Sequence, residues 1–79
     1  MNEIKKSELI EAAEYMGGEY KKDSSGWYIQ VDTGDNTSKE NYDDLISDAD
    51  ELRKILNNWE IIELWADHDT QIIELKEIK

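Results

Sequence analysis

A long apolar stripe in the middle of the chain is the sequence feature that most constrains its fold. The segment NYDD predicts the start of a helix there, with Asn41 as N-cap and Asp44 completing an approximate capping box. Arg53 and Lys54 fall near its C-terminal end, where cations suit the helix dipole. A helix with one apolar face must bury that face against other elements. The stripe keeps helical spacing over five turns through Tyr42, Leu45, Ile46, Ala49, Leu52, Leu56 and Trp59.

A second, shorter helix and a β-hairpin are expected before this stripe. Ser7 is the expected N-cap, and Gly17-Gly18 ends the helix. Its apolar residues at helical spacing are Leu9, Ala12, Ala13 and Met16. The segments GEYKK and WYIQVD, separated by DSSG, then predict two strands, because the second segment alternates apolar and polar residues. Residues 33–40 form a polar loop in this interpretation.

The C-terminal segment WEIIELWADHDTQIIELKEIK predicts a second hairpin, with ADHDT as its turn. Its first strand, residues 61–65, is apolar on both faces. Strict alternation places Ile61 and Trp65 on one face, and Ile62 and Leu64 on the other. This favours a central strand, or a face covered by a partner.

The order α-β-β-α-β-β predicts a small α+β fold with an antiparallel four-stranded sheet and two helices packed on one face. We expect one compact domain over residues 1–79. The chain has no cysteine to brace it, so three tryptophans and four tyrosines must supply much of the core. Their polar edges then need partners or a position at the rim.

Composition also limits the classes of function. No apolar run approaches the length of a membrane span, and the N-terminus lacks the apolar core of a signal peptide, so we expect a soluble cytoplasmic protein. A net charge of −11 argues against direct binding to nucleic acid or to an anionic membrane. It favours a basic partner, a cation, or solubility alone.

No catalytic or cofactor site is predicted. The single histidine, His68, lies in the turn ADHDT, where we expect a solvated side chain, and one histidine without cysteine is too few for zinc. No register of residues 32–46 fits an EF-hand loop, and no phosphate-binding glycine loop is present. A looser cation site from Asp32, Asp35 and Asn36 remains open. We expect a protein that is not an enzyme and needs no cofactor or metal.

The segment DTGDNTSKENYDDLISDADE, residues 32–51, has eight carboxylates and one lysine, and so holds seven of the eleven net negative charges. Asp44, Asp48 and Glu51 stack along one flank of the expected helix with no base among them, whereas Asp50 pairs with Lys54 at i,i+4. The first helix repeats this acidic character with Glu8, Glu11 and Glu14.

Two interpretations of this segment remain open. In the first, the acidic face is solvated and keeps the protein soluble. In the second, Asp44, Asp48 and Glu51 imitate a strand of phosphates, because the length of helix that they occupy spans about three phosphate spacings. In the second interpretation aromatic anchors give specificity, and Tyr28 is expected to be more exposed than Tyr42 or Trp65. The candidate partner-binding residues are Asp32, Asp35, Glu40, Asp43, Asp44, Asp48, Asp50, Glu51 and Tyr28.

In size, acidity and α+β make-up, and in the segment DTGDNTSKENYDDLISDADE, the chain resembles small inhibitors carried by phages and mobile elements. Anti-CRISPR proteins are the best-known group, and immunity proteins against nuclease toxins are similar in character. The resemblance implies a non-enzymatic inhibitor, working in the host cytoplasm if phage-encoded, that covers the nucleic-acid site of a nuclease or CRISPR effector with acidic side chains. The alternative is a small assembly module that forms a homodimer or a host complex through the apolar strand around Ile61 and Trp65.

Overall fold

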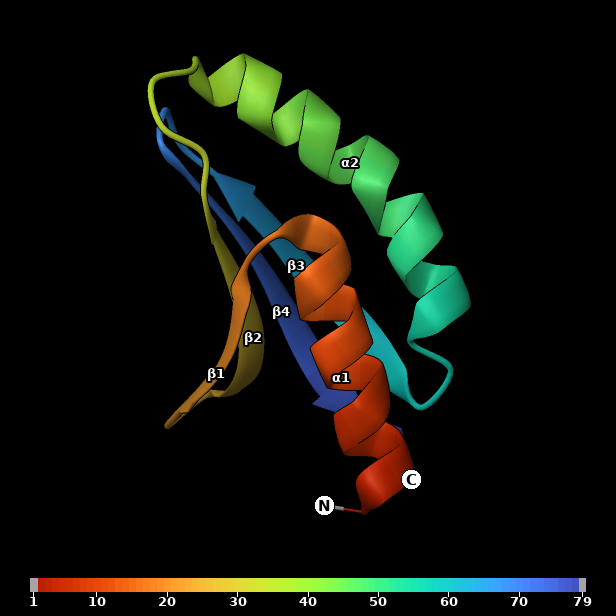
Figure 1. Cartoon of the computed structure of the whole chain (residues 1–79). Coiled ribbons are helices and arrows are strands. Elements are labelled where there is room, and N and C mark those ends of the chain that lie inside the picture. The colour runs from red at the N-terminus through yellow and green to blue at the C-terminus, as the bar shows by residue number, and fades with distance from the viewer. Residues whose placement is uncertain (1, 79) are drawn as a thin grey trace.

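Six elements follow one another in the predicted order α-β-β-α-β-β (Figure 1). The structure is a computed structural model, and it describes residues 2–78. The elements are α1 (Glu3–Met16), β1 (Glu19–Asp23), β2 (Gly26–Asp32), α2 (Ser38–Ile55), β3 (Trp59–Ala66) and β4 (Thr70–Glu77). Both predicted hairpins are present, and the α+β fold class is confirmed.

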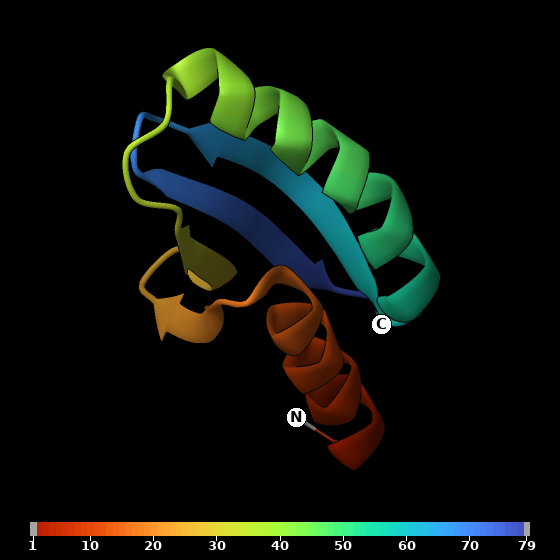
Figure 2. The same cartoon turned by 45° about the horizontal axis from the view of Figure 1, so that its top comes forward.

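The four strands form one antiparallel sheet in the order β1-β2-β4-β3. Both helices pack against the same face of this sheet, with α2 running along β3, and no element of residues 2–78 covers the other face (Figure 2). We call this second face the open face. The expectation that residues 61–65 form a central strand is wrong, because β2 and β4 are central and β3 lies at an edge.

The core lies between the helices and the inner face of the sheet. Trp59 shows how an aromatic residue enters it: the indole is buried, and its Nε1–H donates to the Lys5 carbonyl at 2.9 Å. The Trp59 ring also meets Trp27 edge-on, with centroids 6.0 Å apart. The buried apolar residues that form the core are Leu9, Ala12, Ala13, Ile29, Val31, Leu45, Leu52, Leu56, Trp59, Ile73 and Leu75.

Helix α1 begins five residues before the predicted start. The N-cap is Asn2, whose side chain accepts from the Lys5 N–H at 2.9 Å, so the assignment of Ser7 as N-cap is wrong. The predicted end is confirmed, since Gly17 adopts the left-handed conformation and Gly18 N–H donates back to Ala13. Gly18 then passes so near β2 that a Cβ would lie 2.3 Å from the Gln30 carbonyl.

Helix α2 also begins earlier than predicted, at Ser38 within the expected loop. Thr37 is its N-cap and forms a capping box with Glu40, so the capping box expected at Asn41 and Asp44 is wrong. The helix ends at Ile55, and Trp59 opens β3 instead of continuing the apolar stripe.

Asn41 is instead a buried connection between three segments. Its side-chain amide donates to Thr33 Oγ1 at 2.7 Å and to the Asp67 carbonyl at 2.8 Å. Its Oδ1 accepts from Asn36, and its backbone carbonyl accepts from the buried Gln71 side chain at 2.8 Å. These bonds hold the start of α2 against the β3–β4 turn.

A β-bulge in β3 changes which side chains share a face. Ile61 pairs with Leu75 and Glu63 pairs with Glu74, so Ile62 is the extra residue between them. Ile61 therefore faces the core, whereas Trp65 lies on the open face opposite Ile72. The prediction that Ile61 and Trp65 share a face is wrong for this reason.

Candidate functional site

The acidic residues of the segment 32–51 are spread over three elements. Asp32 ends β2, Asp35 lies in the loop before α2, and the other six belong to α2. All eight are exposed except Asp48, which is half-buried. The Glu40 carboxylate accepts from Thr37 in the capping box and is fixed by that contact.

Three of these carboxylates are neutralised by bases on the same helix. Lys39 Nζ lies 2.7 Å from Asp43, Arg53 Nη1 lies 3.1 Å from Asp50, and Lys54 Nζ lies 3.0 Å from Glu51. The expected pair of Asp50 with Lys54 is therefore wrong, and so is the expectation that Glu51 has no base beside it. Exposed pairs of this kind contribute little to stability, but they reduce the local negative field.

Asp44 and Asp48 are the two members of the expected stripe that form no ion pair in the described residues. Within residues 2–78, no basic group lies at ion-pair distance from either carboxylate. Partial burial raises the pKa of Asp48, and repulsion from Asp44 raises it further. A positive charge beside these carboxylates would offset both effects on the pKa.

The acidic residues of α1 are not equivalent to one another. Both carboxylate oxygens of Glu8 accept from Asn58, one from its backbone N–H at 2.8 Å and one from its side chain at 2.7 Å. Glu8 thus joins α1 to the start of β3, and it is half-buried. Glu11 and Glu14 remain exposed.

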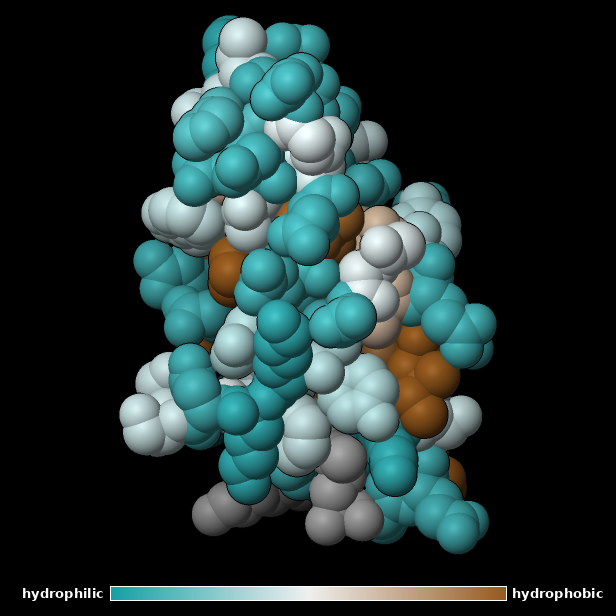
Figure 3. Space-filling view, turned by 60° about the vertical axis from the view of Figure 1, so that its left-hand side comes forward, coloured by the Kyte–Doolittle hydropathy of each residue, from teal (hydrophilic) through white to brown (hydrophobic). Residues whose placement is uncertain are grey.

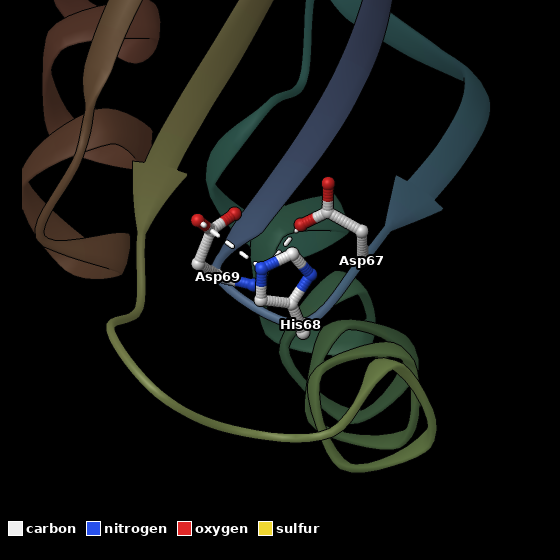
Figure 4. A group of neighbouring side chains, drawn as sticks. All are labelled: Asp67, His68 and Asp69. Carbon is white, nitrogen blue, oxygen red and sulfur yellow. Dashed lines mark hydrogen bonds and ion pairs between the residues drawn. The ribbon is translucent and has the colours of Figure 1, made fainter.

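The turn between β3 and β4 brings together Asp67, His68 and Asp69 (Figure 4). One Asp67 oxygen accepts from the backbone N–H groups of Asp69 and Thr70, at 3.0 and 2.9 Å, and these bonds lower the pKa of Asp67. The His68 ring lies 3.6 Å from the Asp69 carboxylate and is exposed, as the sequence predicted. The turn geometry thus accounts for the cluster.

Asp32 and Asp35 are not part of such a cluster. In the described part of the chain, residues 67–69 are the one group of three acidic or histidine side chains close enough to share a metal ion. The Asp32 carboxylate accepts from Gln30 at 3.4 Å, and the Asn36 amide donates to Asn41. These contacts give no support to a cation site at Asp32, Asp35 and Asn36.

The open face carries a shallow hollow of about 410 Å³ that the sequence did not reveal. Its walls are aromatic and aliphatic, and its acidic residues come from three different strands. We call it the open-face hollow, and it is lined by Asp23, Tyr28, Gln30, Glu63, Trp65, Ile72 and Glu74. Detecting it required the β2–β4 pairing and the bulge in β3, neither of which has a local sequence signal.

Glu63 and Glu74 lie directly opposite each other on β3 and β4 within this hollow. Like charges in this position destabilise a sheet. The Glu63 side chain raises the pKa of Glu74 by hydrogen bonding, and burial and repulsion from Glu63 and Asp23 add to the effect. A proton or a positive charge at Glu74 would therefore reduce this repulsion.

The exposures of the aromatic candidates differ from the prediction. Tyr28 is half-buried in the open-face hollow, whereas Trp65 is 49% exposed and Tyr42 is 43% exposed. The expectation that Tyr28 is the most exposed of the three is wrong. Its position on the polar side of β2 is as predicted, but Glu74 of β4 lies opposite it and reduces its exposure.

Hydrophilic side chains cover most of the surface seen in Figure 3, and apolar areas appear between them, the broadest at the right of the view. No helix within residues 2–78 combines the length and the apolar character that crossing a bilayer requires. A comparison with protein-family models gave no matching family, and comparisons with curated proteins and with solved structures gave no match either.

Proposed function

We propose that the protein is a non-enzymatic inhibitor that binds a basic, nucleic-acid-handling protein, a nuclease or a CRISPR effector, and covers its nucleic-acid site. The observation that carries this proposal is the flank of α2 with Asp44 and Asp48, whose negative charge no basic group of residues 2–78 neutralises. These two residues form the centre of the proposed surface, and Glu40, with Asp35 in the loop before the helix, extends it toward the start of α2. Asp32 instead contacts Gln30, which lines the open-face hollow.

The physical basis is electrostatic. A cleft that holds nucleic acid concentrates positive potential, so an acidic ligand associates with it rapidly and binds less tightly as salt increases. Carboxylates also form the bidentate hydrogen bonds with arginine that phosphates form. The pairing of Asp43, Asp50 and Glu51 within α2 leaves the Asp44–Asp48 flank as the strongest negative feature of the helix.

Charge reversal on this flank tests the proposal. Candidate targets are first recovered by pull-down from a host lysate at low and high salt, and cleavage by each purified nuclease or effector is then measured with added protein. The variant Asp44→Lys/Asp48→Lys should inhibit at least about tenfold less than the parent, because it loses two charges that attract a basic target and gains two that repel it. Its fold should be retained, because the repulsion between the two new lysines is offset by their attraction to Glu40 and Glu51 at helical spacing.

The matched control is Asp43→Lys/Asp50→Lys, which changes net charge equally on another side of the same helix. This variant should inhibit nearly as well as the parent. Equal losses of inhibition in both variants would show that inhibition depends on net charge alone. Full inhibition by Asp44→Lys/Asp48→Lys would refute the proposed surface.

The second candidate function is an assembly module, and the edge position of β3 favours it. Ile62 and Trp65 of this strand are 52% and 49% exposed, and one side of the strand has no neighbour within residues 2–78. Light scattering separates the two functions. A dimer whose mass does not change with salt, and which Ile62→Lys disrupts, supports assembly through β3.

A further inference from the structure

The open-face hollow has its own recognition chemistry, distinct from that of α2. It lies on the side of the sheet opposite to both helices, so its residues and the Asp44–Asp48 flank do not form one surface. Binding at the hollow is therefore independent of the function proposed for α2.

The hollow combines two kinds of wall. Trp65 and Ile72 lie opposite each other on β3 and β4, and Tyr28 lies on β2, so these side chains offer an apolar and aromatic surface. Asp23, Glu63 and Glu74 contribute three carboxylates, and Glu63 directly faces Glu74 across the strands.

The bases on the open face do not neutralise these carboxylates. Lys21 Nζ donates to Gln30 Oε1 at 3.4 Å, and neither it nor Lys76 forms an ion pair with Asp23, Glu63 or Glu74 in the described residues. The facing pair Glu63–Glu74 is thus an arrangement of like charges that the fold maintains without a counter-ion of its own.

We propose that the open-face hollow binds an arginine side chain presented by an extended segment of a partner protein. The guanidinium fits between Glu63 and Glu74, with Asp23 nearby, and the aliphatic stem lies against Trp65 and Ile72. Charge complementarity selects a cation. Arginine suits the site better than lysine because its planar group binds carboxylates in bidentate fashion and stacks on aromatic rings.

Arginine binding can be measured on the full chain by two-dimensional ¹H–¹⁵N NMR. The probe is the peptide acetyl-Gly-Val-Arg-Val-Gly-amide, and the matched peptide has citrulline, which keeps the shape and removes the charge. The arginine peptide should shift the amide signals of Tyr28, Ile72 and Glu74 and the indole signal of Trp65. The citrulline peptide should bind at least about tenfold more weakly.

Two variants of equal charge locate the binding. Glu63→Gln/Glu74→Gln should weaken arginine binding at least about tenfold, whereas Asp44→Asn/Asp48→Asn removes two charges on the helix side and should leave it unchanged. The first variant removes a repulsion, and a well-dispersed spectrum shows whether it folds. Trp65→Ala, at a half-exposed position, is a second test of the same hollow and should also weaken binding.

Several outcomes would overturn the inference. Equal binding of the arginine and citrulline peptides would exclude charge recognition, and equal loss in both double variants would reduce the effect to net charge. Tighter binding of a lysine peptide would exclude the preference for guanidinium. Concentration-dependent shifts of the same signals without peptide would assign the hollow to a second copy of the chain. Calcium that shifts these signals and displaces the peptide would assign it to a divalent cation.

Discussion

Among single residues, Asn41 has the largest predicted effect on stability. Its buried side chain is the donor for both the Thr33 hydroxyl and the Asp67 carbonyl. The substitution Asn41→Ala leaves these acceptors without their partner and opens a small cavity. The free energy of unfolding should fall by about 1–3 kcal/mol, the usual cost of buried polar groups that lose their hydrogen bonds. Urea denaturation measures this change.

Asn57→Ala is the matched control, because Asn57 is exposed and lies outside the helix. It should change the free energy of unfolding by less than about 0.5 kcal/mol. If the two alanine variants were equally stable, the Asn41 hydrogen bonds would not hold the β3–β4 turn against α2.

Asn41 also shows where prediction from the sequence fails at the residue scale. Asparagine before an apolar periodic run is typical of an N-cap, and the local pattern around Asn41 fits one. Its actual partners, Thr33 and Asp67, are distant in sequence and become neighbours only through the fold. The exposure of Tyr28 is wrongly predicted for the same reason, because it depends on the strand that pairs with β2.

Among the elements, α2 depends on its capping box. The Thr37 hydroxyl accepts from the Glu40 N–H at 3.1 Å, and the Glu40 carboxylate accepts from the Thr37 N–H at 3.3 Å. Thr37→Ala removes the first of these bonds. The free energy of unfolding should fall by about 1 kcal/mol, the typical cost of losing an N-cap side chain. Thermal or urea denaturation followed by circular dichroism measures it.

Ser47→Ala provides the comparison within the same helix, at an exposed interior position. Alanine has the higher helix propensity, so this variant should be as stable as the parent or slightly more stable. A Thr37→Ala protein as stable as Ser47→Ala would contradict the assignment of Thr37 as the N-cap.

The type and order of the elements could be predicted from the sequence. Their boundaries, and the faces on which their side chains lie, could be predicted less well. Helical spacing in the apolar stripe and alternation in β2 are local patterns, and both gave correct elements. The bulge at Ile62 has no such pattern, because alternation alone continues through it. An extra residue in a strand moves every later side chain to the opposite face. Strict alternation therefore predicts the wrong face for Trp65, and the open-face hollow cannot be predicted from it.

Over the whole molecule, the negative charge is divided between two sides of the sheet. The Asp44–Asp48 flank belongs to the helical side, and the Glu63–Glu74 pair belongs to the open face. The first can be recognised in the sequence because residues 32–51 are contiguous. The second is assembled from residues that are far apart, including Asp23 and Glu74, so only the fold brings it together.

Both acidic sites should make the protein more stable in mildly acidic solution than at neutral pH. The pKa of Asp48 is raised from 3.8 and that of Glu74 from 4.5, so each group binds its proton more tightly in the folded state. Their stabilising contribution is complete below the unfolded pKa and is lost as pH rises through the folded pKa. The free energy of unfolding, measured by urea denaturation, should therefore increase modestly as pH falls from about 7 toward the unfolded pKa values of these groups, 3.8 and 4.5.

At still lower pH the free energy of unfolding should decrease as pH falls. Hydrogen bonds from Ser25 lower the pKa of Asp23 below 3.8, and those from Asp69 and Thr70 lower that of Asp67. The stability from these two groups is present above their unfolded pKa and is lost as pH falls through the folded value, so stability should pass through a maximum. The double variant Asp48→Asn/Glu74→Gln should lose the rise on the neutral side and keep the fall on the acidic side. A continuous decrease from neutral pH downward in the parent protein would mean that the pKa values of Asp48 and Glu74 are not raised in the folded state.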